Sequence, residues 1–338
     1  MGAPTASVII ATLNEQDTIA HVVSTALACP EVVEVIIADG GSTDATTQQV
    51  ASLAARDARV RLISNPEGRQ SVGLNRAASV ARGDLLVRMD AHTRYADDYI
   101  AASIAAWRRG IAVGGPMVAQ GANAWGHAIA NAMADPLAIG PGRFHHAAAV
   151  EQVDTVYLGT FARAAFLELG GYRTFPSGTV EDADFYARWR ASGGVVVVDP
   201  SIRSWYRPRS TWSSLTRQFF KYGRGKAELL RLNGRLPTMR PLAPFLLVLA
   251  LVTGIGVLPW TWLPLAAVLT GWLVGLVVVA MRAPGNRLRT SIAAATMHLA
   301  FGSGMWAGLF ARRPAPETRG LAETPPRSAH HPDGNRRR

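Results

Sequence analysis

Carboxylates, hydroxyls and amides follow two short apolar segments near the start of the chain. Residues 39–44 read DGGSTD, and a carboxylate at a strand end followed by glycines and hydroxyls suits a nucleotide that approaches the backbone closely. The segment 12–15 reads TLNE and would face the same edge. A capped turn before a helix explains either pattern equally well. The candidate nucleotide-binding residues are Thr12, Asn14, Glu15, Asp39, Gly41, Ser42 and Asp44.

Asp90 and His92 form a candidate site for a divalent cation. They lie two positions apart after the apolar segment 84–89, so in an extended chain both side chains point to one face. Such a pair can hold a cation that bridges a diphosphate and neutralises charge on a leaving group. A capped loop remains the alternative interpretation.

A second acidic cluster opens a helix that we expect at 185–191. Residues 179–184 read TVEDAD, and acids at a helix start are commonly caps that complement the helix dipole, which applies above all to Glu181. Transfer of a group to a hydroxyl, however, needs a carboxylate that accepts the hydroxyl proton. Asp182, in the first turn, can point into a cleft and do this.

The segment 218–222, QFFKY, lies on a basic amphipathic helix predicted at 213–235. Gln218 could contact an acceptor and Lys221 a diphosphate. Phe219 and Tyr222 are equally plausible core positions of the same helix.

The elements that must position these residues alternate along the first hundred positions. Short β-branched runs predict strands at 7–11, 33–38, 60–64 and 84–89, and helical spacing predicts helices at 15–29, 44–58 and 71–82. This alternation predicts parallel βαβ units in a three-layer α/β domain, which binds ligands beyond the carboxyl ends of its strands. A second half of the domain follows at 114–206, with a strand at 194–198.

An uncharged stretch at 241–281 contains no Asp, Glu, Lys or Arg. About 20 residues cross a bilayer as a helix, so we expect a helical hairpin at 241–258 and 263–281 with the interfacial aromatics of PWTW between them. Arginines flank both outer ends and place them in the cytoplasm. A third apolar segment, 291–310, is interrupted by His298 and by the residues 302–304. It could span or lie in the interface, and the basic tail after it favours an interfacial or re-entrant position.

The predicted organisation is therefore a catalytic domain at 1–235, a membrane region at 236–312 and a disordered basic tail at 313–338. The net charge of +11 divides into +9 within 200–240, +7 within 282–338 and −5 elsewhere. Basic charge beside an apolar region suits a membrane surface or phosphates, and argues against a nucleic-acid partner. A single cysteine excludes an intrachain disulfide.

In their order and spacing, these segments resemble the inverting family 2 glycosyltransferases of the GT-A fold over about the first 230 residues. The family's N-E, D-G-x-S-x-D, A-x-G-D, D-x-D, E-D and Q-x-x-R-W motifs correspond to 14–15, 39–44, 81–84, 90–92, 181–182 and 218–222. Two motifs differ, because His92 replaces the second acid and QFFKY replaces Q-x-x-R-W. The sequence MDAHTRY at 89–95, GGY at 170–172 and the membrane region are similar to the ExoA-like branch of succinoglycan biosynthesis.

The resemblance implies a role for each motif. Asp39 would hold the base of the donor, with Arg69 and Asn75 also at the donor, and Asp90 with His92 would serve the metal. Asp182 would be the catalytic base, and Glu181, Gln218, Lys221 and Tyr222 would face acceptor and diphosphate. The cation would be Mn2+ or Mg2+, and the imidazole suits softer cations.

The implied enzyme is multi-pass in the cell membrane with a cytoplasmic catalytic domain. It would transfer a sugar from a nucleotide diphosphate donor, UDP-sugar foremost, to a lipid-linked saccharide in exopolysaccharide or cell-envelope glycan assembly. A polyprenyl-phosphate glycosyltransferase and a non-catalytic nucleotide-sugar-binding membrane scaffold remain alternatives. The implied enzyme requires Asp39, Asp90 and Asp182 to converge on one cleft.

Overall fold

A computed structural model of the chain describes residues 3–311. The disordered tail predicted for 313–338 lies outside the described residues.

Strands and helices alternate through the N-terminal half. In chain order they are β1 (Ala6–Thr12), α1 (Ile19–Leu27), β2 (Val32–Asp39), α2 (Thr46–Ala54), β3 (Val60–Ser64), α3 (Gln70–Ser79), β4 (Leu85–Arg88), β5 (Arg94–Tyr95), α4 (Tyr99–Ala106), β6 (Ile111–Gly114) and β7 (Val118–Ala119). The four predicted strands coincide with β1 to β4 within one residue at each end.

Shorter elements follow, and four long helices complete the described chain. The shorter elements are α5 (Ala124–Met133), α6 (Pro136–Ile139), α7 (Arg143–His146), β8 (Glu151–Gln152), β9 (Thr160–Ala162), α8 (Arg163–Glu168), α9 (Glu181–Ala191), β10 (Val195–Val198) and β11 (Ser204–Tyr206). The long helices are α10 (Trp212–Asn233), α11 (Leu242–Gly256), α12 (Leu263–Arg282) and α13 (Arg287–Phe310).

The main sheet has eight strands in the order β3-β2-β1-β4-β9-β6-β10-β8. Strands β1 to β4 pair in parallel, as helical crossovers require. Strand β9 runs antiparallel to β4 and β6, and β8 runs antiparallel to β10. A separate small sheet has the order β5-β11-β7.

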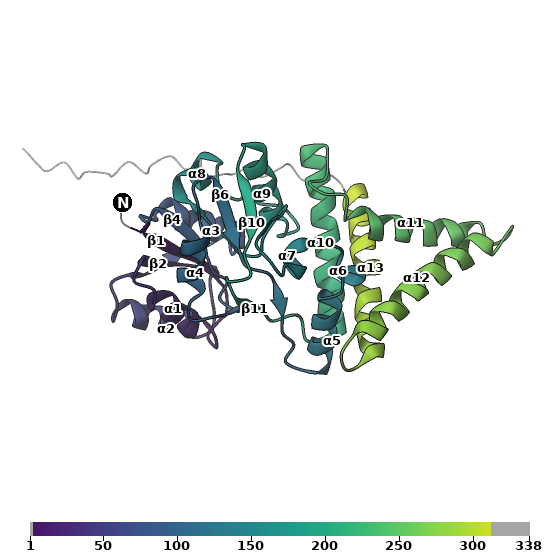
Figure 1. Ribbon diagram of the computed structural model, residues 1–338, viewed down its shortest axis with the longest axis horizontal. Coiled ribbons are helices and arrows are strands. Elements are labelled where there is room, and N and C mark those ends of the chain that lie inside the picture. The colour runs from purple at the N-terminus through teal and green to yellow at the C-terminus, as the bar shows by residue number, and fades with distance from the viewer. Residues whose placement is uncertain (1–2, 312–338) are drawn as a thin grey trace, which may run out of the picture.

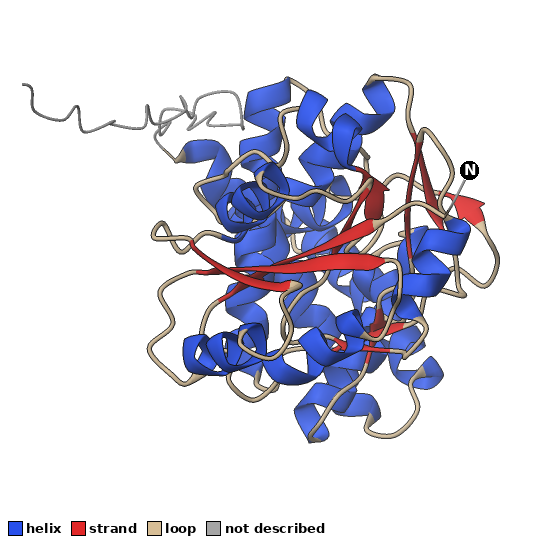
Figure 2. Cartoon of the chain, turned by 90° about the vertical axis from the view of Figure 1, so that its left-hand side faces the viewer, coloured by secondary structure: helices blue, strands red, loops and turns tan. Residues whose placement is uncertain are grey.

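Helices cover both faces of the main sheet (Figure 2). One face packs on α1, α2 and α4 through a core that includes Val8, Ile10 and Val50. The other face packs on α3, α8 and α9 through a core that includes Ile9, Leu74 and Phe185. The predicted three-layer α/β architecture is therefore confirmed.

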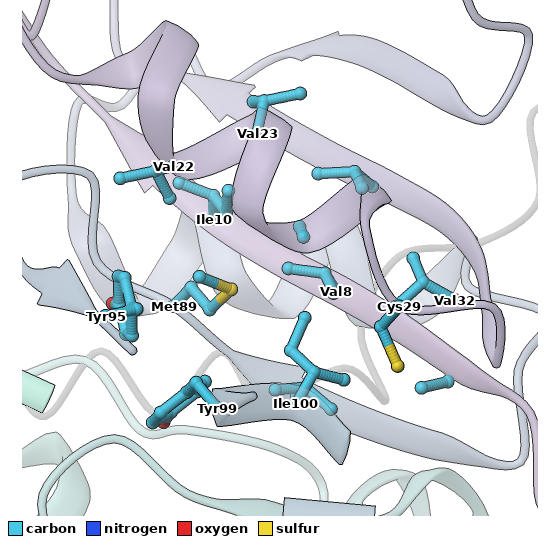
Figure 3. Close-up of a cluster of buried hydrophobic side chains, with 14 of the residues drawn as sticks. Val8, Ile10, Val22, Val23, Cys29, Val32, Met89, Tyr95, Tyr99 and Ile100 are labelled. Carbon is cyan, nitrogen blue, oxygen red and sulfur yellow. The ribbon is translucent and has the colours of Figure 1, made fainter. Parts of the chain in front are cut away.

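Successive side chains of β4 and of the two residues that follow it point to opposite faces of the sheet, and this decides which of them reach the site. Val87 and Met89 belong to the core on the α1 side, where Met89 lies between Ile10 and Tyr95 (Figure 3). Leu86 belongs to the core on the α9 side. Because side chains alternate between faces in an extended chain, Arg88 and Asp90 point to the side of α9.

Helices α10 and α13 lie side by side beyond the sheet (Figure 1). Their backbones approach closely at glycines: a Cβ on Gly223 would lie 2.0 Å from the carbonyl oxygen of Phe301, and one on Gly304 would lie 2.1 Å from that of Phe220. Helix α10, predicted to close the catalytic domain, therefore packs mainly on the C-terminal helices.

Helices α11 and α12 form the predicted hairpin and project away from the sheet (Figure 1). Helix α12 has 20 residues, and among residues 3–311 it is the one helix long and apolar enough to cross a membrane. Helix α11 has 15 residues, about 22 Å at 1.5 Å per residue, which is shorter than the roughly 30 Å hydrocarbon core. The length expected for a second spanning helix is thus not reached.

The glycine packing predicts that a glycine-to-alanine substitution affects stability differently at two helical positions. Gly304→Ala should destabilise the protein by about 1–3 kcal/mol, because the new methyl group overpacks the contact with α10. Gly271→Ala on α12, where a Cβ meets nothing within 4 Å, should be neutral or stabilising by up to about 1 kcal/mol. Thermal unfolding in detergent measures both, and equal shifts would contradict the packing.

Candidate functional site

One cavity of about 1130 Å³ gathers most of the predicted catalytic residues. It lies between the carboxyl edge of the sheet and α10. The predicted residues that line it are Asp90, His92, Glu181, Asp182, Gln218, Lys221 and Tyr222. These residues come from segments separated by as much as 132 positions, so the fold creates the juxtaposition.

A buried arginine joins the two acidic clusters. Arg88 is 6% exposed; its Nε lies 3.2 Å from Asp90 Oδ1, and its terminal nitrogen lies 3.6 Å from Glu181 Oε1. Burial lowers the pKa of Arg88, but the carboxylates, led by Asp90, outweigh this and hold the pKa well above its ordinary value. The guanidinium therefore stays charged and holds β4 and α9 together.

Asn75 supports this arginine through Tyr172. Its side-chain amide donates to the carbonyl of Tyr172 at 2.7 Å and accepts from the amide of Tyr172 at 2.8 Å. The guanidinium carbon of Arg88 lies 5.5 Å from the centre of the Tyr172 ring. Both ends of the Asn75 side-chain amide are hydrogen-bonded to Tyr172, and its predicted place at the donor stays a prediction.

The three carboxylates that open α9 have different surroundings. Asp184 is fully buried and pairs with Arg173 and Arg188, which makes it structural. Burial, followed by repulsion from Asp182, raises the pKa of Glu181 to about 7, while Arg88 opposes this shift. Asp182 lines the cavity and accepts a hydrogen bond of 2.6 Å from the amide of Ala183.

The turn that presents these acids is strained and is supported by α10. Val180, which precedes α9, has φ of +65°, a rare conformation for a β-branched residue that concentrates at functional sites. Glu228 accepts a hydrogen bond from the amide of Ser177 at 3.0 Å. A Cβ on Gly225 would lie 2.3 Å from Thr179 Oγ1, so a glycine is needed where α10 passes the turn.

The predicted nucleotide loop forms a compact network at the same sheet edge. Asp39 accepts from the amides of Gly41 and Ser42 at 3.0 Å and from the Ser42 hydroxyl. Asn14, with φ of +56°, accepts from the amide of Thr43 at 2.8 Å. These bonds, and those of Asp44 to Thr46 and to the amide of Gln16, explain why α1 and α2 begin later than predicted.

Asp39 does not line the large cavity, whereas Asp90 and Asp182 do. Strand β1 separates β2 from β4, so their ends lie roughly 10 Å apart at the usual strand spacing. The predicted convergence of three carboxylates therefore holds for two of them, with Asp39 further along the same edge.

Thr12 pairs with Asp39 across β1 and β2, and its buried Oγ1 has no hydrogen-bond partner among the described residues. Arg69 lines a smaller pocket of about 280 Å³ that also includes Glu181.

His92 and Asp90 suit a divalent cation. Within residues 3–311 no three His, Cys, Asp or Glu side chains are grouped to hold a metal alone, but a cation that bridges a diphosphate takes much of its coordination from the phosphates. Glu15 Oε1 lies 3.1 Å from His92 Nδ1 and, chiefly through that hydrogen bond, raises the pKa of His92. A carboxylate at Nδ1 is the usual partner of a metal-binding imidazole and leaves Nε2 for the metal. The two residues therefore fit such a cation.

Several polar residues at the cavity were not predicted from the sequence, among them Gln70, Arg88, Arg209 and Lys226. Gln70 donates to Asp90 Oδ1 at 3.2 Å. The one local signal was Arg88, a charged residue inside an otherwise apolar strand.

Comparison with known proteins identifies the family. The model of glycosyl transferase family 2 matches residues 7–154. The succinoglycan biosynthesis protein ExoA of Rhizobium meliloti (strain 1021) is 32% identical over 297 residues, which cover 83% of this chain and 88% of that protein. The chain belongs to glycosyltransferase family 2.

A solved structure supports the GT-A fold of this glycosyltransferase. The mannosyltransferase PcManGT from Pyrobaculum calidifontis, in complex with GDP-Man and Mn2+, superposes with a TM-score of 0.56 at 19% identity. The match covers 92% of this chain and 88% of that protein, so it extends through the C-terminal helices.

The buried Glu181 of this glycosyltransferase predicts a pH-dependent stability. Its pKa is higher in the folded protein than its ordinary value of 4.5, so its burial should cost progressively more stability as pH rises from 4.5 to about 7. Glu181→Gln should therefore gain thermal stability relative to wild type over this range. The exposed Glu168→Gln serves as the control, and a constant difference between Glu181→Gln and wild type would contradict the shift.

Proposed function

We propose that this glycosyltransferase transfers a sugar, with inversion, from a nucleotide diphosphate donor to a hydroxyl of a lipid-linked saccharide at the cytoplasmic side of a membrane. The observation that carries the proposal is the shared cavity of Asp90 and Asp182, with cations around both. A transfer of this kind needs one acidic site for the donor diphosphate and a separate carboxylate for the acceptor proton.

The donor would lie along the carboxyl edge of the sheet. The base and ribose would meet the loop of Asp39 and the unpartnered hydroxyl of Thr12, and the diphosphate would extend toward Asp90. Lys221 and Arg209 line the same cavity and would supply positive charge to phosphate oxygens. A UDP-sugar is the favoured donor.

Asp90 and His92 would hold a divalent cation, Mn2+ or Mg2+, which would neutralise charge on the leaving diphosphate. Arg88 keeps Asp90 in place, and Gln70 donates to the same carboxylate oxygen. Glu15 orients the imidazole of His92.

Asp182 would accept the proton of the acceptor hydroxyl as that oxygen attacks the anomeric carbon. Attack opposite the leaving diphosphate in one displacement inverts the anomeric configuration. Of the adjacent pair, Glu181 is buried and paired with Arg88, whereas Asp182 lines the cavity without such an ion pair among the described residues and is the proposed base. Gln218 donates to the hydroxyls of Tyr206 and Tyr222 at 2.9 Å, and this polar group faces the acceptor space.

The hairpin of α11 and α12 supports a membrane-bound acceptor. It exposes large apolar side chains along its length, together with Trp260 and Trp262 at its tip, and exposed apolar patches of this kind mark membrane or protein contacts. The ExoA relative carries succinoglycan biosynthesis in its name, which favours exopolysaccharide or cell-envelope glycan assembly as the process served.

A transfer assay on membranes that contain the protein tests the proposal. Radiolabelled nucleotide sugars are added with Mn2+, with Mg2+ or with a chelator, and organic solvent then extracts the lipids. We expect cation-dependent label in the lipid fraction. Label on a polyprenyl phosphate bearing one sugar would instead indicate direct transfer to the lipid phosphate, and donor binding without any turnover would indicate a scaffold.

Asp182→Asn should separate donor binding from transfer. Removal of a general base costs about 10²- to 10⁴-fold in rate, whereas the donor contacts at Asp39 and Asp90 remain. The measurements are the initial rate of transfer and the Kd of the nucleotide diphosphate. Asp97→Asn, an exposed acid outside the cavity, should retain full activity, and transfer by Asp182→Asn at the wild-type rate would rule out Asp182 as the base.

A further inference from the structure

The cavity continues past the catalytic acids to the helical hairpin. Its far end is lined by Leu247 of α11, Val268 and Trp272 of α12 and Phe301 of α13. The same continuous space thus has a charged end at the sheet and an apolar end among the projecting helices. Its volume of about 1130 Å³ exceeds the roughly 300–1,000 Å³ typical of a pocket for one small ligand.

A group of polar residues lies where the two ends meet. Lys226 of α10 and Arg240, just before α11, both line the cavity, and Arg240 forms an ion pair with Asp154. Burial lowers the pKa of Lys226, while Asp182 and Asp154 oppose this effect and Arg240 adds to it. Lys226, Arg240 and Asp182 all line this one cavity.

Two further polar side chains of this group lack partners. The Nδ1 atom of His145 and the Oγ1 atom of Thr155 are buried and have no hydrogen-bond partner among the described residues. Both residues line the cavity. Buried polar atoms are nearly always hydrogen-bonded, so unpartnered atoms in the same cavity as two cations indicate a place for an anionic ligand that accepts and donates hydrogen bonds.

We propose that Lys226 and Arg240 bind the phosphate of a lipid acceptor whose hydrocarbon chain enters the apolar end of the cavity between α11, α12 and α13. This assignment rests on the proposed function and names the acceptor's binding site. Cations bind the phosphate through charge-assisted hydrogen bonds, and Val268, Trp272 and Phe301 remove the first units of the chain from water. A water-soluble donor has no use for an apolar end that reaches the hairpin.

The arrangement also orders the acceptor along the cavity. With its phosphate at Lys226 and its chain toward α12, the remaining polar part of the acceptor extends toward Asp182. Arg240 joins the hairpin to the catalytic domain through Asp154, so the phosphate site forms where the membrane helices meet the catalytic domain.

Binding of farnesyl diphosphate to the full-length protein in detergent tests the site. Isothermal titration calorimetry should show that Lys226→Gln and Arg240→Gln each weaken binding about tenfold or more, since hydrogen bonds to charged groups carry about that much affinity. Arg235→Gln is the matched control, because Arg235 is an exposed cation on the same segment and does not line the cavity; it should bind as wild type does.

Val268→Trp tests the apolar end separately. It should weaken farnesyl diphosphate binding and leave binding of inorganic diphosphate unchanged, and thermal unfolding confirms that each variant is folded. Inorganic diphosphate that binds wild type as tightly as farnesyl diphosphate, or unchanged farnesyl diphosphate affinity in folded Lys226→Gln and Arg240→Gln, would overturn the proposal.

These outcomes are distinguishable from failure of the proposed function. If the wild-type protein hydrolyses or transfers from nucleotide sugars but binds farnesyl diphosphate independently of Lys226 and Arg240, the proposed function stands and the proposed phosphate site is overturned. If the protein binds farnesyl diphosphate through both cations but turns over no nucleotide sugar, the proposed phosphate site stands and the proposed function is overturned.

Discussion

The site depends on one buried cation, Arg88, held between carboxylates from distant parts of the chain. A guanidinium that is 6% exposed is tolerated only when charged partners compensate for the water it has lost. Asp90 follows the strand that carries Arg88, whereas Glu181 opens α9 and comes from more than ninety residues later. The arginine therefore fixes the distance between the proposed metal-binding segment and the helix that carries the proposed base.

The surrounding layers keep this arrangement in place. Asn75 clamps the backbone of Tyr172, whose ring lies beside the guanidinium of Arg88. Helix α10 supports the strained turn at Val180 and packs on α13 through glycines. The C-terminal helices thus close the catalytic cavity and extend it toward the hairpin. In this way, the same helices that would contact a membrane also provide a wall of the proposed active site.

Much of the fold could be predicted from the sequence because it is encoded locally. The strands β1 to β4 are short runs of β-branched residues between turns, and alternation along them separates core from site. Asp90, His92, Glu181 and Asp182 could be selected because their residue types and spacing suit known chemistry, and the structure brings them to one cavity. The roles of these residues remain predictions.

The rest depends on tertiary contacts that no local pattern shows. The pairing of Asn75 with Tyr172 joins positions 97 residues apart, so no local pattern indicates it. The strand order places β1 between β2 and β4, which separates Asp39 from the other two carboxylates. Nothing in the sequence distinguishes Lys226 from the other cations of the basic helix. It reaches the cavity because α10 packs against the turn at Val180.

A double-mutant cycle between Arg88 and Glu181 tests most directly whether the buried charge joins the two acidic clusters. The free energy of unfolding would be measured by denaturant titration in detergent at pH 8 for wild type, Arg88→Met, Glu181→Gln and the double variant. If the buried charge joins the clusters, the two effects are not additive and differ from their sum by a coupling of about 0.5–3 kcal/mol, as for residues in direct contact. Additive effects would show that the two side chains do not interact and that Arg88 does not join the two acidic clusters.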